Sequence, residues 1–153
     1  MNLTNEYIRG LIDGEGCFSF CTSSFVVRNE TLYRGKVPAF QISMHVRDKD
    51  LIEGVRDHLG LKNKVYVYKS SQKDGIKRGD KATLIVRKAC DLRMIIVPFF
   101  YGKLRGHKGK QFKEWLEKIG SDERVGEKFK IIHRLYKCGY WEKIQNIPEK
   151  FRS

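Results

Sequence analysis

Residues 7–16 read YIRGLIDGEG, a short helical pattern that ends in closely spaced glycines. Its aliphatic residues have the i, i+3, i+4 spacing of one buried helix face: Ile8, Leu11 and Ile12. Gly10 and Gly14 lie four residues apart on another face, which leaves a groove where a second helix backbone can approach closely. We expect Gly14 and Gly16 to end the helix, because glycine accepts the positive φ found at many helix C-termini.

Two acidic residues stand at the end of this predicted helix. Asp13 and Glu15 lie where the helix dipole is already negative, which disfavours each carboxylate by roughly 0.3 kcal/mol or more. Local rules of this kind are broken most often at functional sites, and a bound divalent cation would remove the conflict. For an isolated D-x-E sequence the alternative is a pair of solvated acids in a turn.

Residues 8–16, IRGLIDGEG, resemble the signature helix of the LAGLIDADG homing endonucleases. The departures by residue type are Arg9, where the family has a small residue, and Gly14, where it has alanine. The resemblance implies that Glu15 binds the catalytic metal and that the Gly14 carbonyl is a second ligand. It also implies that Asp13 belongs to the structure of the helix end.

Two later segments resemble further elements of the same family. Residues 40–45, FQISMH, resemble its second strand, in which the residue at Gln41 holds or polarises the nucleophilic water. Residues 98–112 resemble a basic loop whose K-x-x-x-F lysine, here Lys108, reaches the active site. Each segment alone is a weak signal, since a strand glutamine is usually polar surface. Together the three family-like segments, in the right order, span most of residues 7–119 and imply the catalytic set Glu15, Gln41 and Lys108.

The order of periodic segments predicts an α+β domain with the helix–strand–strand–helix–strand–strand–helix order of these endonucleases. We expect a four-stranded antiparallel DNA-binding sheet, further C-terminal helices, and one domain over residues 1–153, with 139–153 as a surface tail. The expected strands are residues 17–27, 35–45, 64–69 and 82–87. The expected later helices are residues 48–60, a short one from Ala89 that stops before Pro98, 112–120, and a last one capped by Ser121. Asp74-Gly75 predicts a hairpin turn.

The charge pattern favours a polyanionic partner. The chain has 31 Lys and Arg against 18 Asp and Glu, a formal net charge of +13. Basic residues dominate 62–88, whereas acids concentrate on the predicted helices, so a basic sheet face can lie along nucleic acid. A merely solvated basic face is the alternative. By the resemblance, the DNA-facing residues are Ser19, Cys21, Ser23, Arg28, Arg34, Lys36, Tyr66, Tyr68, Thr83 and Ile85. This assignment depends on strand alternation, which a bulge would shift.

The cysteines and the apolar runs indicate a reduced, membrane-free setting. Four scattered cysteines without a C-x-x-C pair favour free thiols over a zinc site or disulfides. No apolar run approaches the ~20 residues of a membrane span, and the amino terminus does not read as a signal peptide. We therefore expect an intracellular location, in a chloroplast, a mitochondrion or a prokaryotic cytoplasm.

A single signature helix predicts assembly in pairs. By the resemblance, one-motif chains act as homodimers, and the interface is expected at Gly10, Gly14 and Asp13. The expected activity is Mg²⁺-dependent (or Mn²⁺-dependent) cleavage of a long pseudo-palindromic DNA duplex with short 3′ overhangs, in intron or intein homing. Double-stranded DNA is the expected partner, and no organic cofactor is expected. The alternatives are a non-cleaving relative that acts as an RNA maturase or DNA-binding protein, and a basic ribosome-associated protein.

Overall fold

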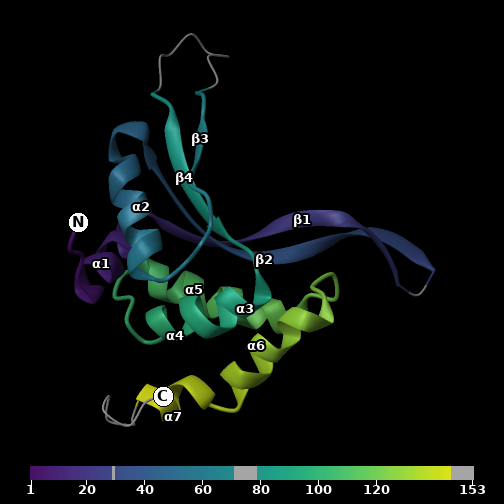
Figure 1. Cartoon of the computed structure of the whole chain (residues 1–153). Coiled ribbons are helices and arrows are strands. Elements are labelled where there is room, and N and C mark those ends of the chain that lie inside the picture. Colours follow the sequence, from purple (N-terminus) through teal and green to yellow (C-terminus); the bar gives the residue numbers. More distant parts are fainter. Residues whose placement is uncertain (29, 71–78, 146–153) are drawn as a thin grey trace.

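The computed structural model describes residues 1–28, 30–70 and 79–145 of the chain. Its centre is a four-stranded antiparallel sheet in the order β1-β2-β4-β3 (Figure 1). The strands are β1 (Gly16–Arg28), β2 (Thr31–His45), β3 (Tyr66–Tyr68) and β4 (Lys81–Val86). The predicted α+β class and the number of strands are confirmed.

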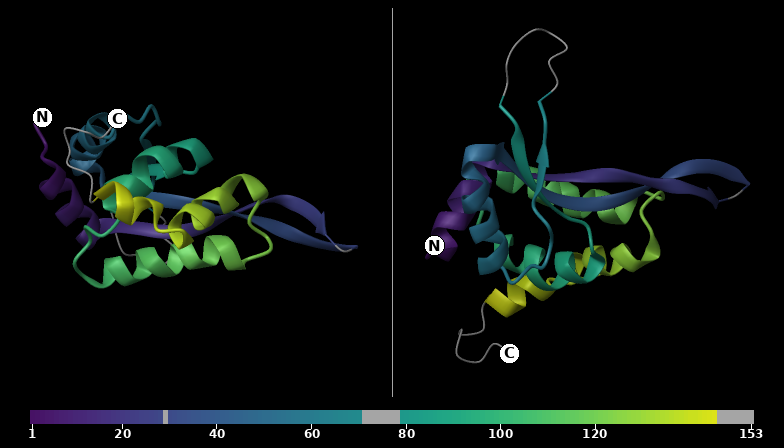
Figure 2. Two further views of the ribbon diagram at one scale, coloured as in Figure 1. Left: turned by 90° about the horizontal axis from the view of Figure 1, so that it is seen from below. Right: turned by 45° about the horizontal axis from the view of Figure 1, so that its top comes forward.

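The helices gather against one face of the sheet, as the views in Figures 1 and 2 agree. They are α1 (Asn5–Glu15), η1 (Val46–Asp48), α2 (Lys49–His58), α3 (Ala89–Asp91), η2 (Leu92–Ile96), α4 (Val97–Phe100), α5 (His107–Ser121), α6 (Glu127–Lys137) and α7 (Tyr140–Gln145). No helix among the described residues is long and apolar enough to cross a membrane. We call the face of the sheet turned away from this layer the open face.

An aromatic cluster joins the helix layer to the sheet. The ring of Phe18 on β1 lies 5.5 Å from that of Phe40 on β2, 4.9 Å from that of Phe112 and 5.3 Å from that of Trp115 on α5. The Trp115 indole N–H also donates to the Ser19 carbonyl at 2.8 Å, which fixes α5 against β1. Buried aromatic residues of this size contribute most of the apolar area of a small core.

Helix α1 buries the stripe that its spacing predicts. Ile8 and Ile12 are fully buried, and Leu11 packs at the margin of the core. The predicted reason for the helix end is wrong, because Gly16 has an extended backbone (φ −78°) and the positive-φ glycines of the described chain lie elsewhere. A Cβ on Gly16 would instead collide with the Ile12 side chain, so glycine is needed there for close packing.

The helical run over residues 89–100 continues through Pro98, contrary to the prediction. The segment η2 is a π-helical turn, in which the Val97 N–H donates to the Leu92 carbonyl. Pro98 then stands in the first turn of α4, where its missing N–H leaves no hydrogen bond broken. The wider turn just before the proline lets the chain remain helical.

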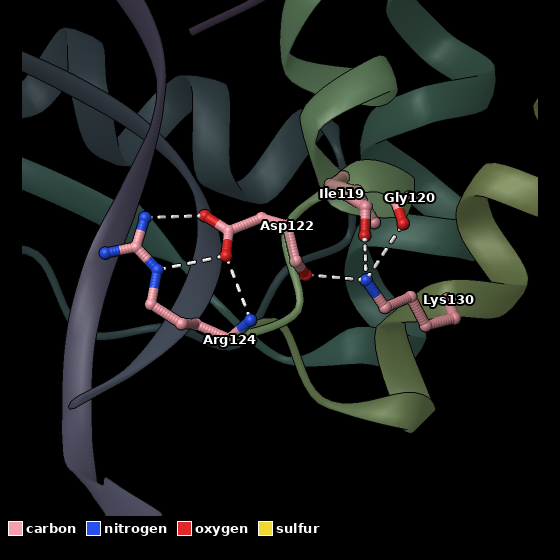
Figure 3. Close-up of polar contacts among 5 residues, drawn as sticks. All are labelled: Ile119, Gly120, Asp122, Arg124 and Lys130. Atoms are coloured by element: carbon pink, nitrogen blue, oxygen red, sulfur yellow. Dashed lines mark hydrogen bonds and ion pairs between the residues drawn. The ribbon is translucent and has the colours of Figure 1, made fainter. Parts of the chain in front are cut away.

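The turn between α5 and α6 differs from the predicted cap at Ser121. Ser121 is the last residue of α5, and Gly126 precedes α6. Figure 3 shows how side chains close this turn. Lys130 donates to three carbonyls, those of Ile119 (2.9 Å), Gly120 (3.1 Å) and Asp122 (2.7 Å).

The same turn attaches to the sheet. Arg124 pairs with the Asp122 carboxylate through its guanidinium and its backbone N–H. The Arg124 carbonyl accepts the N–H of Lys36 at 2.9 Å, and Val125 forms a parallel bridge with Lys36. The free edge of β2 beyond β4 is therefore covered by this turn.

Residues 139–153 were predicted as a surface tail that Trp141 could anchor, and residues 140–145 form helix α7. Helix α7 buries Trp141 to 2% exposure, and Gln145 donates from its side chain to the Tyr101 carbonyl. Burial and the neighbouring Glu142 raise the pKa of Tyr101. Residues 146–153 lie outside the described residues, as does the predicted hairpin turn at Asp74-Gly75.

The long hairpin of β1 and β2 contains a bulge. The register shifts between Thr22 and Phe25, so that one extra residue lies on β1. Gly35 faces this bulge on β2, and a Cβ there would collide with the Ser23 hydroxyl. Beyond the bulge the hairpin extends past the helix layer (Figure 1).

Candidate active site and DNA-facing surface

Asp13 ties the end of α1 to the start of α5. Its carboxylate accepts the Arg105 N–H at 3.0 and 3.1 Å and the Gly106 N–H at 3.2 Å. These N–H groups lead into α5, where the helix dipole is positive, so the carboxylate is stabilised there although it opposes the dipole of its own helix. Asp13 therefore takes part in the structure of the helix end.

Glu15 is different, since it has no such partner. It is the last residue of α1, it is exposed, and within the described residues it makes no hydrogen bond or ion pair. Gly14 precedes it, and the Gly14 carbonyl is among the last four of the helix, which have no partner inside the helix. The end of α1 thus offers an unpaired carboxylate beside backbone carbonyl oxygen.

Gln41 lies beside the start of β1. Its Cα pairs with that of Cys17, two residues after Glu15, and on the other side with that of Ile85. The side chain is half-buried on the open face. It is therefore placed next to the end of α1, as the resemblance implies.

Lys108 approaches the same region from α5. The structure begins α5 at His107, so Lys108 lies in the first helical turn and not in a loop as predicted. A lysine there opposes the positive dipole end, just as Glu15 opposes the negative end of α1. The Asp13 contacts hold these two mismatched helix ends together, and α1 also contacts β1 and β2. The ends of α1 and α5 each therefore carry a charge that their helix dipole disfavours, a departure from local rules that occurs most often at functional sites.

The donor set fits a hard divalent cation only in part. No group of three His, Cys, Asp or Glu in the described chain forms a complete metal site. Mg²⁺ in phosphate chemistry, however, takes one or two carboxylates and fills its other positions with water and substrate phosphate oxygens. One exposed carboxylate, Glu15, with the Gly14 carbonyl beside it therefore suits Mg²⁺ or Mn²⁺ when a phosphate is present.

Several predicted DNA-facing residues do lie on the open face. Ser19 and Cys21 pair with Ala39 and Val37, and so share the side of Gln41. Tyr66 and Tyr68 on β3 are 50% and 51% exposed, and Lys64 lies 5.4 Å from the Tyr66 ring. Ile85 also lies on this face and is half-buried. Aromatic and basic groups on an open sheet suit contact with nucleic acid.

Other predicted positions are corrected by the structure. Thr83 lies on the open face of β4, as predicted, but it is only 3% exposed and therefore not free to contact DNA. Its hydroxyl is hydrogen-bonded to the Ser43 hydroxyl at 2.8 Å. Lys36 alternates with Phe40 and lines a pocket with Lys118 and Asp122, which places it on the helix side of β2. Its assignment to the DNA face is therefore wrong. Arg34 is exposed on the hairpin beyond Gly35 and lies 4.6 Å from the Phe25 ring, and its contact with DNA stays a prediction.

Two further positions are set by the bulge and the hairpin tip. Ser23 falls in the bulge itself, where its hydroxyl donates to the Ser24 carbonyl at 3.3 Å. The alternation that assigned it to the open face does not hold there. Arg28 pairs with Thr31 at the end of the hairpin, and its side chain is outside what the structure describes.

Sequence reasoning missed polar groups that share the open face. Lys81 is exposed and pairs with both His45 and Tyr68. Ser43 lies between Gln41 and His45 on the same side, so continuing the alternation of β2 finds it. The His45 ring accepts the Arg47 N–H at 3.1 Å and so caps the short helix η1 that follows β2.

The outer side of α1 is uncovered. A Cβ on Gly10 or Gly14 would meet no atom within 4 Å. A pocket of about 410 Å³ runs beside Gly10 and is lined by Glu6, Arg9, Gly10, Asp13, Lys103 and Arg105. Arg9 is anchored, since its side chain donates to the Phe99 carbonyl at 3.0 Å and lies over the Phe99 ring. Burial lowers the pKa of Arg9.

Comparisons of sequence and structure agree with this geometry. A comparison with curated proteins found no match. The homing endonuclease I-TnaI shares 24% identity at a TM-score of 0.60, with 99% of this chain and 100% of that one covered. I-LtrWI bound to its target DNA shares 23% identity at a TM-score of 0.62, and the match covers 88% of this chain and 44% of that one. I-SmaMI bound to an uncleaved DNA target in the presence of calcium ions shares 21% at 0.59, with 89% and 44% covered. The family model described as LAGLIDADG endonuclease matches residues 8–119, and the chain therefore belongs to that family.

Proposed function

We propose that this protein is a homing endonuclease that cuts both strands of a long, pseudo-palindromic DNA duplex and leaves short 3′ overhangs. The observation that carries this proposal is the exposed, unpaired Glu15 carboxylate, which stands at a helix end with the wrong dipole sign beside the open face. In support, Gln41 pairs with Cys17 just after α1, and Lys108 lies in the first turn of α5, whose start is tied to α1 by Asp13. We place this activity inside a cell, in intron or intein homing.

Hydrolysis of a phosphodiester needs an activated water, stabilised charge on phosphorus and a stabilised leaving oxygen. A bound Mg²⁺ (or Mn²⁺) supplies Lewis acidity and makes water more acidic. Glu15 and the Gly14 carbonyl would hold the ion. The Gln41 amide would orient the attacking water, and the Lys108 ammonium would stabilise negative charge that develops on phosphate oxygens.

The duplex is proposed to bind along the open face. Tyr66, Tyr68 and Lys81 offer exposed aromatic and basic groups there, and the net charge of +13 attracts phosphates. I-LtrWI and I-SmaMI, which have this fold, are both bound to DNA in their structures. Strands of the open face can enter the major groove, where base edges differ most.

We propose a homodimer because one chain supplies half of the machinery. It spans 44% of I-LtrWI and of I-SmaMI, whereas it matches I-TnaI along its full length. A second copy would bring a second Glu15 for the second strand. The uncovered glycines of α1 are the surface on which this copy packs.

Replacing Glu15 with glutamine tests the catalytic proposal. Glu15→Gln keeps the shape of the side chain but removes the ligand charge and its unfavourable interaction with the helix dipole. We expect Mg²⁺-dependent cleavage of a selected duplex to fall by about 1,000-fold or more, the size typical of a lost electrostatic group. The free energy of unfolding and DNA binding in EDTA should stay equal or rise slightly.

Glu114→Gln is the matched control, because Glu114 is an exposed helical glutamate whose contact to Lys110 spans 4.0 Å. It should cleave like the wild type. Substantial Mg²⁺-dependent cutting by Glu15→Gln would overturn the mechanism. A wild-type protein that binds duplex or RNA tightly but cuts neither strand of any duplex in a random library would favour the non-cleaving alternative.

A further inference from the structure

Gly10 and Gly14 form a stripe without side chains on the outer face of α1. An exposed side chain, Tyr7 (the knob), and a pocket (the hole) lie on opposite flanks of this stripe. Residues advance by about 100° along an α-helix, so Gly10 and Gly14 stand about 40° apart and opposite the buried isoleucines. Tyr7 lies on the Gly14 flank and is 49% exposed. Glu6, Arg9 and Asp13 lie on the other flank, where the 410 Å³ pocket is found.

Neither glycine is required by the chain itself. No atom lies within 4 Å of a Cβ at either position, and neither has a positive φ. Glycine inside a helix costs about 1 kcal/mol relative to alanine. Such a pair gives an advantage only when another backbone approaches the stripe.

A twofold axis along this stripe brings unlike flanks together. Two copies that face each other across such an axis place the flank with Tyr7 of one copy against the flank with the pocket of the other. We infer that Tyr7 of the partner subunit enters the pocket lined by Glu6, Arg9, Gly10, Asp13, Lys103 and Arg105, and that this contact, made twice, selects the dimer. The inference rests on the homodimer proposed above and names the contact that forms it.

The lining suits a phenol ring. Lys103 and Arg105 form one wall, and within the described residues their side chains have no hydrogen bond or ion pair. Cations of this kind bind an aromatic face. The Glu6 carboxylate can accept the phenol hydroxyl, while Arg9 and Asp13 are already held by Phe99 and by the start of α5. Leaving position 10 without a side chain is what keeps the pocket open.

The first test measures dimerisation without DNA, by sedimentation over a wide range of protein concentration. Tyr7→Ala removes an exposed side chain and should leave the fold intact by circular dichroism. The dimer dissociation constant should rise by at least about 30-fold, because the dimer loses two buried tyrosines, one at each of its two contacts. Tyr140→Ala is the control, since Tyr140 is 44% exposed on α7, away from this face, and it should dimerise like the wild type.

The second test fills the hole and then restores the fit. Gly10→Leu should fold, because its side chain projects into open space, but it should dimerise poorly. Mixing Gly10→Leu with Tyr7→Ala should give a heterodimer more stable than either homodimer. In it, Tyr7 of the first variant enters the open pocket of the second, and the shortened side chain at position 7 of the second faces the filled pocket of the first. Failure of the mixture to recover pairing would overturn the knob-and-hole contact.

The outcomes separate this inference from the proposed function. A dimeric wild type with an equally tight Tyr7→Ala dimer removes the contact but keeps the homodimer. A wild type that stays monomeric at every concentration removes both. Cleavage of duplex DNA, measured separately through Glu15→Gln, reports on the catalytic proposal alone.

Discussion

The carboxyl-terminal ends of α1 and α5 carry side-chain charges of opposite sign. At the end of α5, the Lys130 ammonium donates to three main-chain oxygens (Figure 3), which places a positive group at the negative end of the dipole. At the end of α1 stand two acids, of which Asp13 turns to α5 and Glu15 has no partner among the described residues. The first arrangement stabilises the fold, whereas the second retains an electrostatic conflict, which is where we propose that a cation binds.

The largest effect is expected at the contact that links these helices. Asp13→Ala removes three hydrogen bonds to the N–H groups that lead into α5, so the free energy of unfolding should fall by about 2 kcal/mol. Cleavage by the folded fraction should also fall, because Lys108 is no longer held beside α1. Urea unfolding at one fixed protein concentration, together with cleavage assays, measures both.

Asp13→Asn is the informative companion variant, since its amide oxygen can still accept one N–H. It should lose less stability than Asp13→Ala. An Asp13→Ala protein with unchanged stability and activity would show that the link between α1 and α5 does not matter.

A smaller effect is expected at the end of α5. Lys130→Met keeps the aliphatic stem but leaves three carbonyls without their ammonium, which should lower the free energy of unfolding by about 1.5 kcal/mol. Cleavage per folded molecule should not change. Lys113→Met, at an exposed lysine of α5, is the control and should be near neutral. Loss of activity without loss of stability in Lys130→Met would contradict the contrast between the two helix ends.

The smallest effect concerns pH. Arg124, through its side-chain hydrogen bond, lowers the pKa of Asp122 below its ordinary value. The contribution of this pair is therefore complete above the ordinary aspartate pKa of about 4, and it is lost as pH falls through the lowered native pKa. The pair is partly exposed, so the difference should stay below about 1 kcal/mol. Thermal unfolding from pH 2 to 7 should show a shallower acid decline for Asp122→Asn, and an identical decline would refute the assignment.

Much of the fold follows from periodicity. The alternation around Phe18 and Phe40 and the i, i+3, i+4 spacing of Ile8 and Ile12 each correspond to a buried face. Each of these patterns is local, because it follows from the requirement that one face of a helix or strand be buried. The prediction that the helix stops before Pro98 was wrong, because a π-turn depends on a hydrogen-bond pattern that residue types do not predict.

The site was predictable in part, through resemblance and not through physics alone. Glu15, Gln41 and Lys108 lie on α1, β2 and α5, and α5 is tied to α1 by the Asp13 contact, a long-range hydrogen bond that spacing does not reveal. The prediction that Thr83 contacts DNA was wrong for another reason. Alternation predicts the side of a strand on which a residue lies, but not which neighbours bury it. The prediction for Lys36 was wrong because its alternation with Phe40 along β2 was not followed.

The bulge between Thr22 and Phe25 divides the β1–β2 hairpin into parts that can change at different rates over evolutionary time. On the inner side, Phe18 and Phe40 are locked into the core, so substitutions that shift the strand are removed by selection for stability. On the outer side, Phe25, Val27 and Leu32 are 56%, 68% and 61% exposed, so burial does not fix the identity of these three residues. A lineage can therefore change the residues of the outer hairpin while the centre of the domain stays the same.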